Sequence, residues 1–239
     1  NNMVSLKARS NDLEIMDDLL CEGEVVHQTL RELEFINRWL GGNAITLSGL
    51  DYLLRSHSKS GAISVADLGC GGGDMLKLIN TWGTKKNQTF ELTGVDANPH
   101  IINFARRNCA DQPQIKFECA NVFSENFASR KFDIVVATLF THHFTHSELV
   151  TLLKQWKAQA NLGIVINDLH RHPLAYHSIR LLTRMFSKSA MVKFDAPLSV
   201  RRGFLKKEWK AILKESGIEN YELKWRWAFR WQLVIPTAK

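Results

Sequence analysis

Glycines and two acidic residues form the most informative pattern in this chain of 239 residues. Asp67 precedes a turn that contains Gly69, Gly71 and Gly73, and Asp96 ends the next apolar segment. Glycines let a ligand approach the backbone closely, and the helix that follows such a turn points free N–H groups toward the ligand. An acid at the end of the second strand can accept hydrogen bonds from both hydroxyls of a ribose. The pattern predicts a site for a nucleotide-type cofactor.

Two carboxylates distinguish between kinds of nucleotide cofactor. A dinucleotide turn of the G-x-G-x-x-G type requires a third glycine at position 74, counted from Gly69 and Gly71, and the chain has Asp74 there. Asp67, directly before the turn, would repel a pyrophosphate but suits the ammonium group of an amino acid. The pattern therefore favours S-adenosylmethionine, which carries an amino group and a sulfonium and has no phosphate.

Four histidines are candidate catalytic residues. His142 and His143 follow one apolar segment, and His170 and His172 follow the next. Ligands of a parallel α/β sheet bind outside the carboxyl ends of its strands, so both pairs should face the cofactor cleft. An imidazole has a pKa near neutrality and can accept a proton from a hydroxyl group as a methyl group is transferred to it.

Asp168, His170 and His172 also have the spacing of a possible metal site. Carboxylate and imidazole groups in this pattern can bind zinc or iron. Alternate residues point the same way only if the strand continues past Leu169, and Pro173 argues that it stops. We therefore expect a pocket lined by histidines and no metal.

The pattern of apolar residues predicts the elements that position these groups. Short apolar strands are expected at 64–68, 90–95, 115–119, 132–137 and 163–167. Helices are expected at 12–40, 46–55, 75–82, 99–109, 147–159, 174–187 and 206–216, and two strands at 221–227 and 231–235. Apolar strands that alternate with helices indicate a mostly parallel sheet with both faces covered.

The chain divides into a core and a cap. Residues 1–60 are interpreted as an N-terminal helical cap, and residues 61–239 as the cofactor-binding core with a lid inserted at about 169–205. The lid is expected to be a helix followed by an irregular segment that ends at Gly203. Residues 169–210 hold ten Lys and Arg against two acids. This basic segment could also contact a membrane surface or a carrier protein, or be a solvated helix face.

Aromatic residues alternate with arginines near the end of the chain. At strand spacing Trp225, Trp227, Phe229 and Trp231 fall on one face, with arginines at 226 and 230 on the other. Such a run could stack nucleic-acid bases, but it is also what a half-buried strand requires. We expect the aromatic face to be core.

In its glycine-rich turn and in the order of its predicted strands, the chain resembles the class I S-adenosylmethionine-dependent methyltransferases that act on small molecules. The D-x-G-x-G-x-G motif is present as Asp67, Gly69, Gly71 and Gly73. The likeness covers about residues 62–168, together with the two final strands. It implies a Rossmann-like sheet of seven mostly parallel strands with a closing antiparallel hairpin.

The resemblance also implies roles for individual residues. Asp67 and the glycines would hold the methionine part of the cofactor, and Asp96 the ribose. Asn121 and Val122 would flank the adenine, although many relatives have Asp where Asn121 stands. Residues 141–145 are similar to the His-(His or Asp)-aromatic turn of small-molecule methyltransferases. In the plant-type O-methyltransferases the first His of that turn is the general base, which implies His142, with His143 second.

The composition limits the class of protein to which the chain can belong. Hydrophobic residues make up 45% and charged residues 23%, as in globular proteins, and no apolar run approaches the roughly 20 residues of a membrane span. The first ten residues lack the apolar stretch of a secretory signal. Cys21, Cys70, Cys109 and Cys119 show no C-x-x-C spacing, which favours reduced thiols in the cytoplasm.

The expected activity is methylation of a hydroxyl on a small lipophilic aromatic, quinone or polyketide-like acceptor. One alternative is an RNA or protein methyltransferase that uses the basic cap. The loop at 137–140 lacks the N-P-P-[YF] pattern common in base amino methylation, so nucleic acid is not the expected partner. The other alternative is a protein that binds S-adenosylmethionine without turnover.

Overall fold

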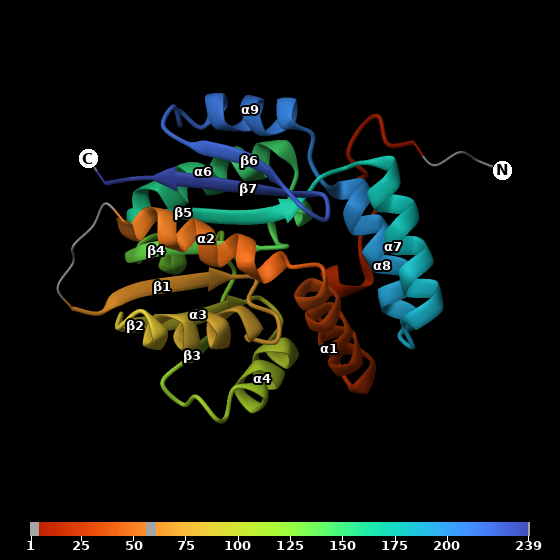
Figure 1. Cartoon of the computed structure of the whole chain (residues 1–239), viewed down its shortest axis with the longest axis horizontal. Coiled ribbons are helices and arrows are strands. Elements are labelled where there is room, and N and C mark those ends of the chain that lie inside the picture. The colour runs from red at the N-terminus through yellow and green to blue at the C-terminus, as the bar shows by residue number, and fades with distance from the viewer. Residues whose placement is uncertain (1–4, 56–60, 239) are drawn as a thin grey trace.

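Seven strands form one sheet in the computed structural model, which describes residues 5–55 and 61–238 (Figure 1). The strands are β1 (Ile63–Leu68), β2 (Phe90–Asp96), β3 (Lys116–Cys119), β4 (Phe132–Thr138), β5 (Ala160–Leu169), β6 (Glu222–Arg226) and β7 (Arg230–Pro236). Their order is β3-β2-β1-β4-β5-β7-β6. The first five are parallel, and β7 is antiparallel to both β5 and β6. The predicted Rossmann-like sheet with a closing hairpin is confirmed.

Helices cover both faces of the sheet because alternate residues of each strand point to opposite sides. In β1, Ile63 and Val65 belong to one core cluster, whereas Ala66 and Leu68 belong to the other. The first cluster includes side chains of α2 (Gly42–Arg55), α3 (Asp74–Lys85) and α4 (Pro99–Asn108). The second includes side chains of α5 (Glu125–Ala128), α6 (His146–Gln159) and α9 (Lys206–Glu215).

A cap lies at the carboxyl ends of the parallel strands, on the right in Figure 1. It consists of the 3₁₀ turn η1 (Ile15–Asp17) and the helices α1 (Glu24–Trp39), α7 (Pro173–Phe186) and α8 (Ala190–Arg202). Helix α8 contacts α1, α7 and η1, so segments far apart in the sequence form one layer. This layer covers the edge of the sheet where ligands of such folds bind. Residues 1–60, interpreted from the sequence as a cap, do not all belong to it, because α2 packs on the sheet against β5 and β7.

The predicted helix at 12–40 is wrong in its first half. Only residues from Glu24 onward form the helix α1, and the segment before it is extended around the short turn η1. The backbone N–H groups of Ile15 and Met16 donate to the carboxylate of Asp195, at 2.8 and 3.2 Å. These long-range bonds hold the segment against α8 and outweigh its local tendency to be helical. The second helix, predicted at 46–55, begins four residues earlier, at Gly42.

The predicted irregular segment up to Gly203 is also wrong, because residues 190–202 form α8. Pro197 lies inside this helix, where its ring removes one backbone hydrogen bond and normally argues against a helix. The hydroxyl of Ser189 caps the helix by accepting from the N–H of Val192. Burial of Val192, Leu198 and Val200 stabilises the helix in spite of the proline.

The predicted aromatic core face at the end of the chain is wrong as well. The strand β6 ends at Arg226, and residues 227–229 form the tip of the hairpin, which interrupts the alternation. Trp231 is buried, but Trp225 is 48% exposed and Trp227 is 75% exposed. Arg230, expected on the outer face, is buried and donates to Asn37 on α1.

Among the described residues, no helix is both long enough and apolar enough to cross a membrane.

Candidate active site

A cavity of about 680 Å³ lies between the carboxyl ends of the parallel strands and the cap. Residues of the turn after β1, the end of β2 and the loops after β3 and β4 form part of its lining. Apolar side chains of α1, α7 and the hairpin tip form another part. The predicted site residues among its lining are Asp67, Gly69, Gly71, Asp96, Asn121, Val122, His142 and His143.

Gly69 shows why the turn after β1 requires glycine. Its φ of +68° is strained for other residues, and an added Cβ would lie 2.2 Å from the ring of Phe140. Gly71 also has a positive φ and lines the cavity. Gly73 does not line it, because its Cα faces Cys109 and the ring of Phe117. The turn therefore brings bare backbone to the cavity at Gly69 and Gly71.

Replacement of Gly69 by Ala should destabilise the protein by about 3 kcal/mol, the sum of backbone strain and a clash with Phe140. Gly217→Ala is the matched control, because its φ is +65° but nothing lies within 4 Å of an added Cβ. The control should lose only about 1 to 2 kcal/mol from strain. Denaturant unfolding of both variants measures the difference. Equal losses would show that Phe140 does not restrict position 69.

Asp67 is a buried carboxylate at the base of this turn. It is 2% exposed, and none of the described residues donates a hydrogen bond to it or forms an ion pair with it. Burial, with the nearby charges of Asp96 and Asp74, raises the pKa of Asp67 to about 8. An unpaired buried carboxylate is unfavourable unless a cation joins it. This geometry fits the ammonium group of an amino-acid ligand.

Asp96 lies at the end of β2, as predicted. Its carboxylate accepts from the backbone N–H of Asn98 at 2.9 Å and from the backbone N–H groups of Gly71 and Ala97. Burial raises the pKa of Asp96, while these backbone donors lower it. A half-buried carboxylate in this position can accept hydrogen bonds from ribose hydroxyls.

Asn121 and Val122 follow β3 and also line the cavity. Val122 is buried and offers an apolar surface. The side-chain oxygen of Asn121 accepts from the N–H of Phe123 at 2.9 Å, which fixes the loop. These residues can contact a flat ring from its edge and its face.

His142 is held between two carboxylates. Its Nδ1 donates to Asp168 at 2.7 Å, and its Nε2 lies 3.5 Å from Glu14. Asp168 also accepts from the hydroxyl of Thr141 and from the backbone N–H of His142. Burial alone would lower the pKa of His142, but Asp168 and Glu14 outweigh it and raise the pKa to about 9. His142 is therefore an imidazolium ion at neutral pH.

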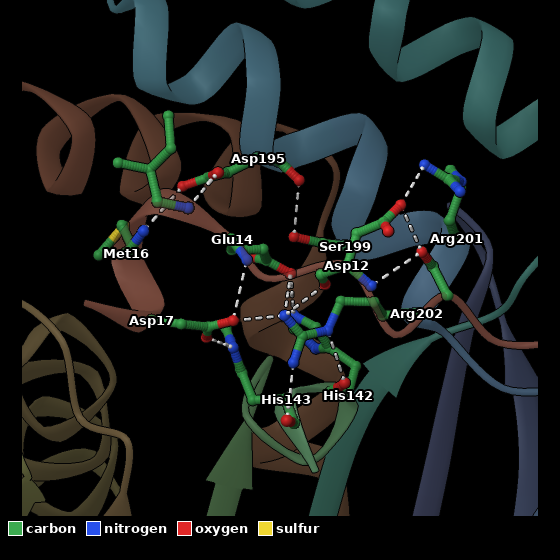
Figure 2. A network of polar contacts seen from close by, with 12 residues as sticks. Asp12, Glu14, Met16, Asp17, His142, His143, Asp195, Ser199, Arg201 and Arg202 are labelled. Atoms are coloured by element: carbon green, nitrogen blue, oxygen red, sulfur yellow. Dashed lines mark hydrogen bonds and ion pairs between the residues drawn. The ribbon is translucent and has the colours of Figure 1, made fainter. Parts of the chain in front are cut away.

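His143 has a different environment. Its Nδ1 donates to Asp17 at 2.5 Å (Figure 2). The ring is half-buried in the lining of the cavity. Burial would raise the pKa of Asp17, but hydrogen bonds from His143 and Arg202 hold it well below its usual range. A histidine that donates through Nδ1 has its lone pair on Nε2 when the ring is neutral. His143 can therefore accept a proton at Nε2.

Two arginines fix the turn that carries both histidines. Arg202 donates to the carboxylate of Asp17 at 2.5 Å and to the backbone carbonyls of His142 and His143 (Figure 2). Arg9 donates to the carbonyls of His142 and Phe144, at 2.9 and 2.8 Å. The N-terminal segment and α8 thus hold η2 (Thr141–His143) in place over the sheet.

The sequence did not indicate Glu14, Asp17, Thr141, Arg9 or Arg202 as site residues. Asp17 is 126 residues from its partner His143, and Glu14 is 128 residues from its partner His142. Residues 1–34 hold eight acids against three Lys and Arg, but nothing in the sequence connects this excess of acids with the histidine turn.

His170 and His172 are outside the lining of the cavity. His170 accepts from the indole N–H of Trp225 at 3.2 Å and packs on Trp231. His172 caps α7, where its Nδ1 accepts from the N–H of Leu174. Since Asp168 turns instead toward His142, the three residues of the possible metal site do not converge. Within the described ranges, Glu14, His142 and His143 do converge, with ligand atoms within 4.8 Å of one another.

A family model described as a methyltransferase domain matches residues 65–163, which span β1 to the first part of β5. No curated protein sequence matches the chain. Among solved structures, the plantazolicin methyltransferase BpumL in complex with SAH is similar, with a TM-score of 0.65 and 18% identity. That match covers 89% of this chain and 88% of the other.

Two further structures share the fold. Human N-acetylserotonin methyltransferase in complex with SAM has a TM-score of 0.63 and 17% identity, over 92% of this chain and 57% of that one. The CMeT domain of the citrinin polyketide synthase has a TM-score of 0.61 and 14% identity, over 82% of this chain and 52% of the other.

The methyltransferase-domain match and the shared fold of the solved structures support a class I S-adenosylmethionine-dependent methyltransferase. The unpaired Asp67 beside a bare backbone turn fits this cofactor.

Proposed function

We propose that this enzyme methylates a phenolic hydroxyl of a small lipophilic acceptor, of an aromatic, quinone or polyketide-like kind. The observation that carries the proposal is a proton-accepting pair, His143 and Asp17, in a cavity to which α1, α7 and the hairpin tip contribute apolar side chains. The apolar lining of the cap side includes Leu33, Ile36, Leu40, Ile179, Leu182 and Phe229. Such walls favour an acceptor with a substantial apolar surface.

The cofactor would supply a methyl group on a sulfonium, which is activated for transfer to an oxygen. In the proposed arrangement Asp67 pairs with the ammonium of its methionine part, and Gly69 and Gly71 pass close to it. Asp96 accepts from the ribose hydroxyls, while Val122 and Asn121 flank the adenine. The third predicted glycine, Gly73, is the N-cap residue of α3 and faces Cys109 and Phe117 instead of the cavity.

His143 is the proposed general base. Its Nε2 would take the proton from the acceptor hydroxyl as the oxygen bonds to the methyl carbon and the bond from that carbon to the sulfonium sulfur breaks, with S-adenosylhomocysteine as the leaving group. Asp17 keeps its hydrogen bond to Nδ1–H and stabilises the imidazolium that forms. General-base catalysis by a well-placed side chain contributes roughly 10² to 10⁴ in rate, and alignment of the reactants supplies a further part.

His142, the first candidate from the sequence, is the less suitable base because it is already protonated at neutral pH. We assign it a positioning role: it ties the turn of residues 140–144 to β5 through Asp168. We assign no proton transfer to His170 or His172, since neither lines the cavity.

The cytoplasm is the proposed compartment. All four cysteines are unpaired in the structure, although Cys21 and Cys119 are open to solvent. Unpaired, solvent-accessible thiols are typical of reducing compartments.

A series of 4-alkylphenols with methyl-labelled S-adenosylmethionine tests the acceptor class. We expect kcat/KM to rise by roughly fourfold for each methylene added until the cavity is filled, because a buried methylene contributes about 0.8 kcal/mol. The product should be the methyl ether. Alkylamines, RNA and peptides serve as competing acceptors in the same assay. Methylation of one of these in preference to every phenol would overturn the proposal, and turnover of RNA should fall steeply as salt rises.

A further inference from the structure

The outer side of α7 carries an apolar stripe that faces solvent. Leu174, Leu181 and Met185 are 62%, 60% and 63% exposed. They are spaced by seven and four residues, so they lie on one side of the helix. Exposed apolar side chains in a continuous row on a helix mark an interaction surface more often than a solvated face.

This stripe lies beside the entrance to the cavity. Ser178 and Leu182 occupy the next positions around α7, and both line the cavity. Leu182 is itself 39% exposed. The apolar surface therefore continues from the outside of α7 into the proposed acceptor site.

Other segments add apolar side chains to the same entrance. Leu13 before η1, Leu19 after it and Trp227 at the hairpin tip all line the cavity. They are 74%, 51% and 75% exposed. Three separate parts of the chain thus frame one opening with apolar groups that lie in contact with water.

Basic residues border the stripe. Between residues 173 and 194 the chain has four exposed bases, Arg180, Arg184, Lys188 and Lys193, and no acid. Arg180 and Arg184 lie about 100° around the helix from Leu181 and Met185, on the side of the stripe away from Ser178 and Leu182. The neighbouring acid on α1, Glu32, accepts from the backbone N–H of Lys188 and from the hydroxyl of Ser187, which ties the end of α7 to α1.

We propose that the stripe on α7 and the apolar entrance form one surface that docks on an anionic lipid bilayer. A helix with an apolar stripe and a basic border lies in the bilayer interface, with its bases near lipid phosphates. This inference rests on the proposed function, because docking would let a lipophilic acceptor that is dissolved in the bilayer enter the cavity without crossing water. Positive charge beside the apolar groups favours an anionic bilayer over a second, equally basic copy of this chain.

Flotation of the full chain with vesicles tests the proposal. We expect the protein to float with vesicles of phosphatidylcholine that contain 30% phosphatidylglycerol, and only weakly with phosphatidylcholine alone. Leu181→Glu/Met185→Glu should lower the partition coefficient by more than tenfold. Arg180→Gln/Arg184→Gln should lower it by roughly 25-fold at low salt, since each base near an anionic surface contributes about fivefold. Lys210→Gln/Lys214→Gln, two exposed bases with the same spacing on α9, is the matched control and should have little effect.

The affinity of each variant for S-adenosylhomocysteine separates this inference from the proposed function, because none of the substituted residues lines the cavity. That affinity should be the same as in the wild type. Failure of the wild type to float with either vesicle would overturn the inference even if phenols are methylated. A dimer that Leu181→Glu/Met185→Glu disperses, without vesicle binding, would assign the surface to a second copy instead. Vesicle binding without phenol turnover would support the docking surface and contradict the proposed acceptor.

Discussion

Replacement of Asp67 by Asn should weaken the binding of S-adenosylhomocysteine by about 100-fold at pH 8 and by little at pH 6. The pKa of the buried Asp67 carboxylate is raised to about 8 in the free protein, whereas pairing with a ligand ammonium requires its ionised form. In the wild type only about 1% of Asp67 is ionised at pH 6, so Kd should fall by about tenfold for each pH unit up to 8.

The Asn variant cannot ionise at position 67, so its Kd should hardly depend on pH over this interval. Kd measured at half-unit steps from pH 6 to 8 gives both slopes. Proton release on binding, from titrations in buffers of different ionisation enthalpy, provides an independent measure. If the Kd of Asp67→Asn depends on pH as steeply as that of the wild type, the titrating group is a different one. Asp96 and Asp74 are the nearest candidates.

Replacement of His143 by Ala should lower kcat for phenol methylation by roughly 10² to 10⁴ and leave the Kd for S-adenosylhomocysteine nearly unchanged. The loss follows from removal of the proton acceptor, and a phenol of lower pKa should be affected less, since it ionises without help. Addition of imidazole should restore part of the rate. His172→Ala is the matched control and should retain kcat within about twofold, because His172 caps α7 outside the cavity.

The response to imidazole distinguishes the base from a residue that only positions the turn. The variant His142→Asn keeps a donor toward Asp168 but cannot carry the charge of the imidazolium. It should lose stability and some activity, and added imidazole should not restore its rate. Rescue of His142→Asn by imidazole, together with no rescue of His143→Ala, would reverse the two roles.

Local patterns predicted the cofactor side of the cavity. Asp67, Gly69 and Gly71 lie within five residues of one another, and Asp96 ends the neighbouring strand, so the order of strands alone brings them together. The same reasoning placed His142 and His143 at the cavity, because they directly follow β4. It failed for His170 and His172, since the chain turns away at the end of β5 toward Phe204 and the hairpin.

The acceptor side depends on contacts that no local pattern contains. Asp17 meets Arg202 and His143 across 185 and 126 residues. The helix α8, which carries Arg202, contains Pro197 and therefore did not have the pattern of a helix. Trp227 is exposed because it lies in the hairpin tip, whereas the sequence predicted it as the last residue of the strand at 221–227. In each case a tertiary interaction outweighed the local preference.

Calorimetric titration of the wild type and of Asp96→Ala with S-adenosylhomocysteine tests whether the cavity binds the methyl donor. We expect one site per chain with micromolar Kd in the wild type, and binding weakened beyond measurement in the variant, because Asp96 is the proposed acceptor for both ribose hydroxyls. NAD should not bind, since it has no amino-acid ammonium group to pair with Asp67. Absence of S-adenosylhomocysteine binding to a folded wild-type chain, or equal binding by Asp96→Ala, would contradict the assignment of this cavity to the methyl donor.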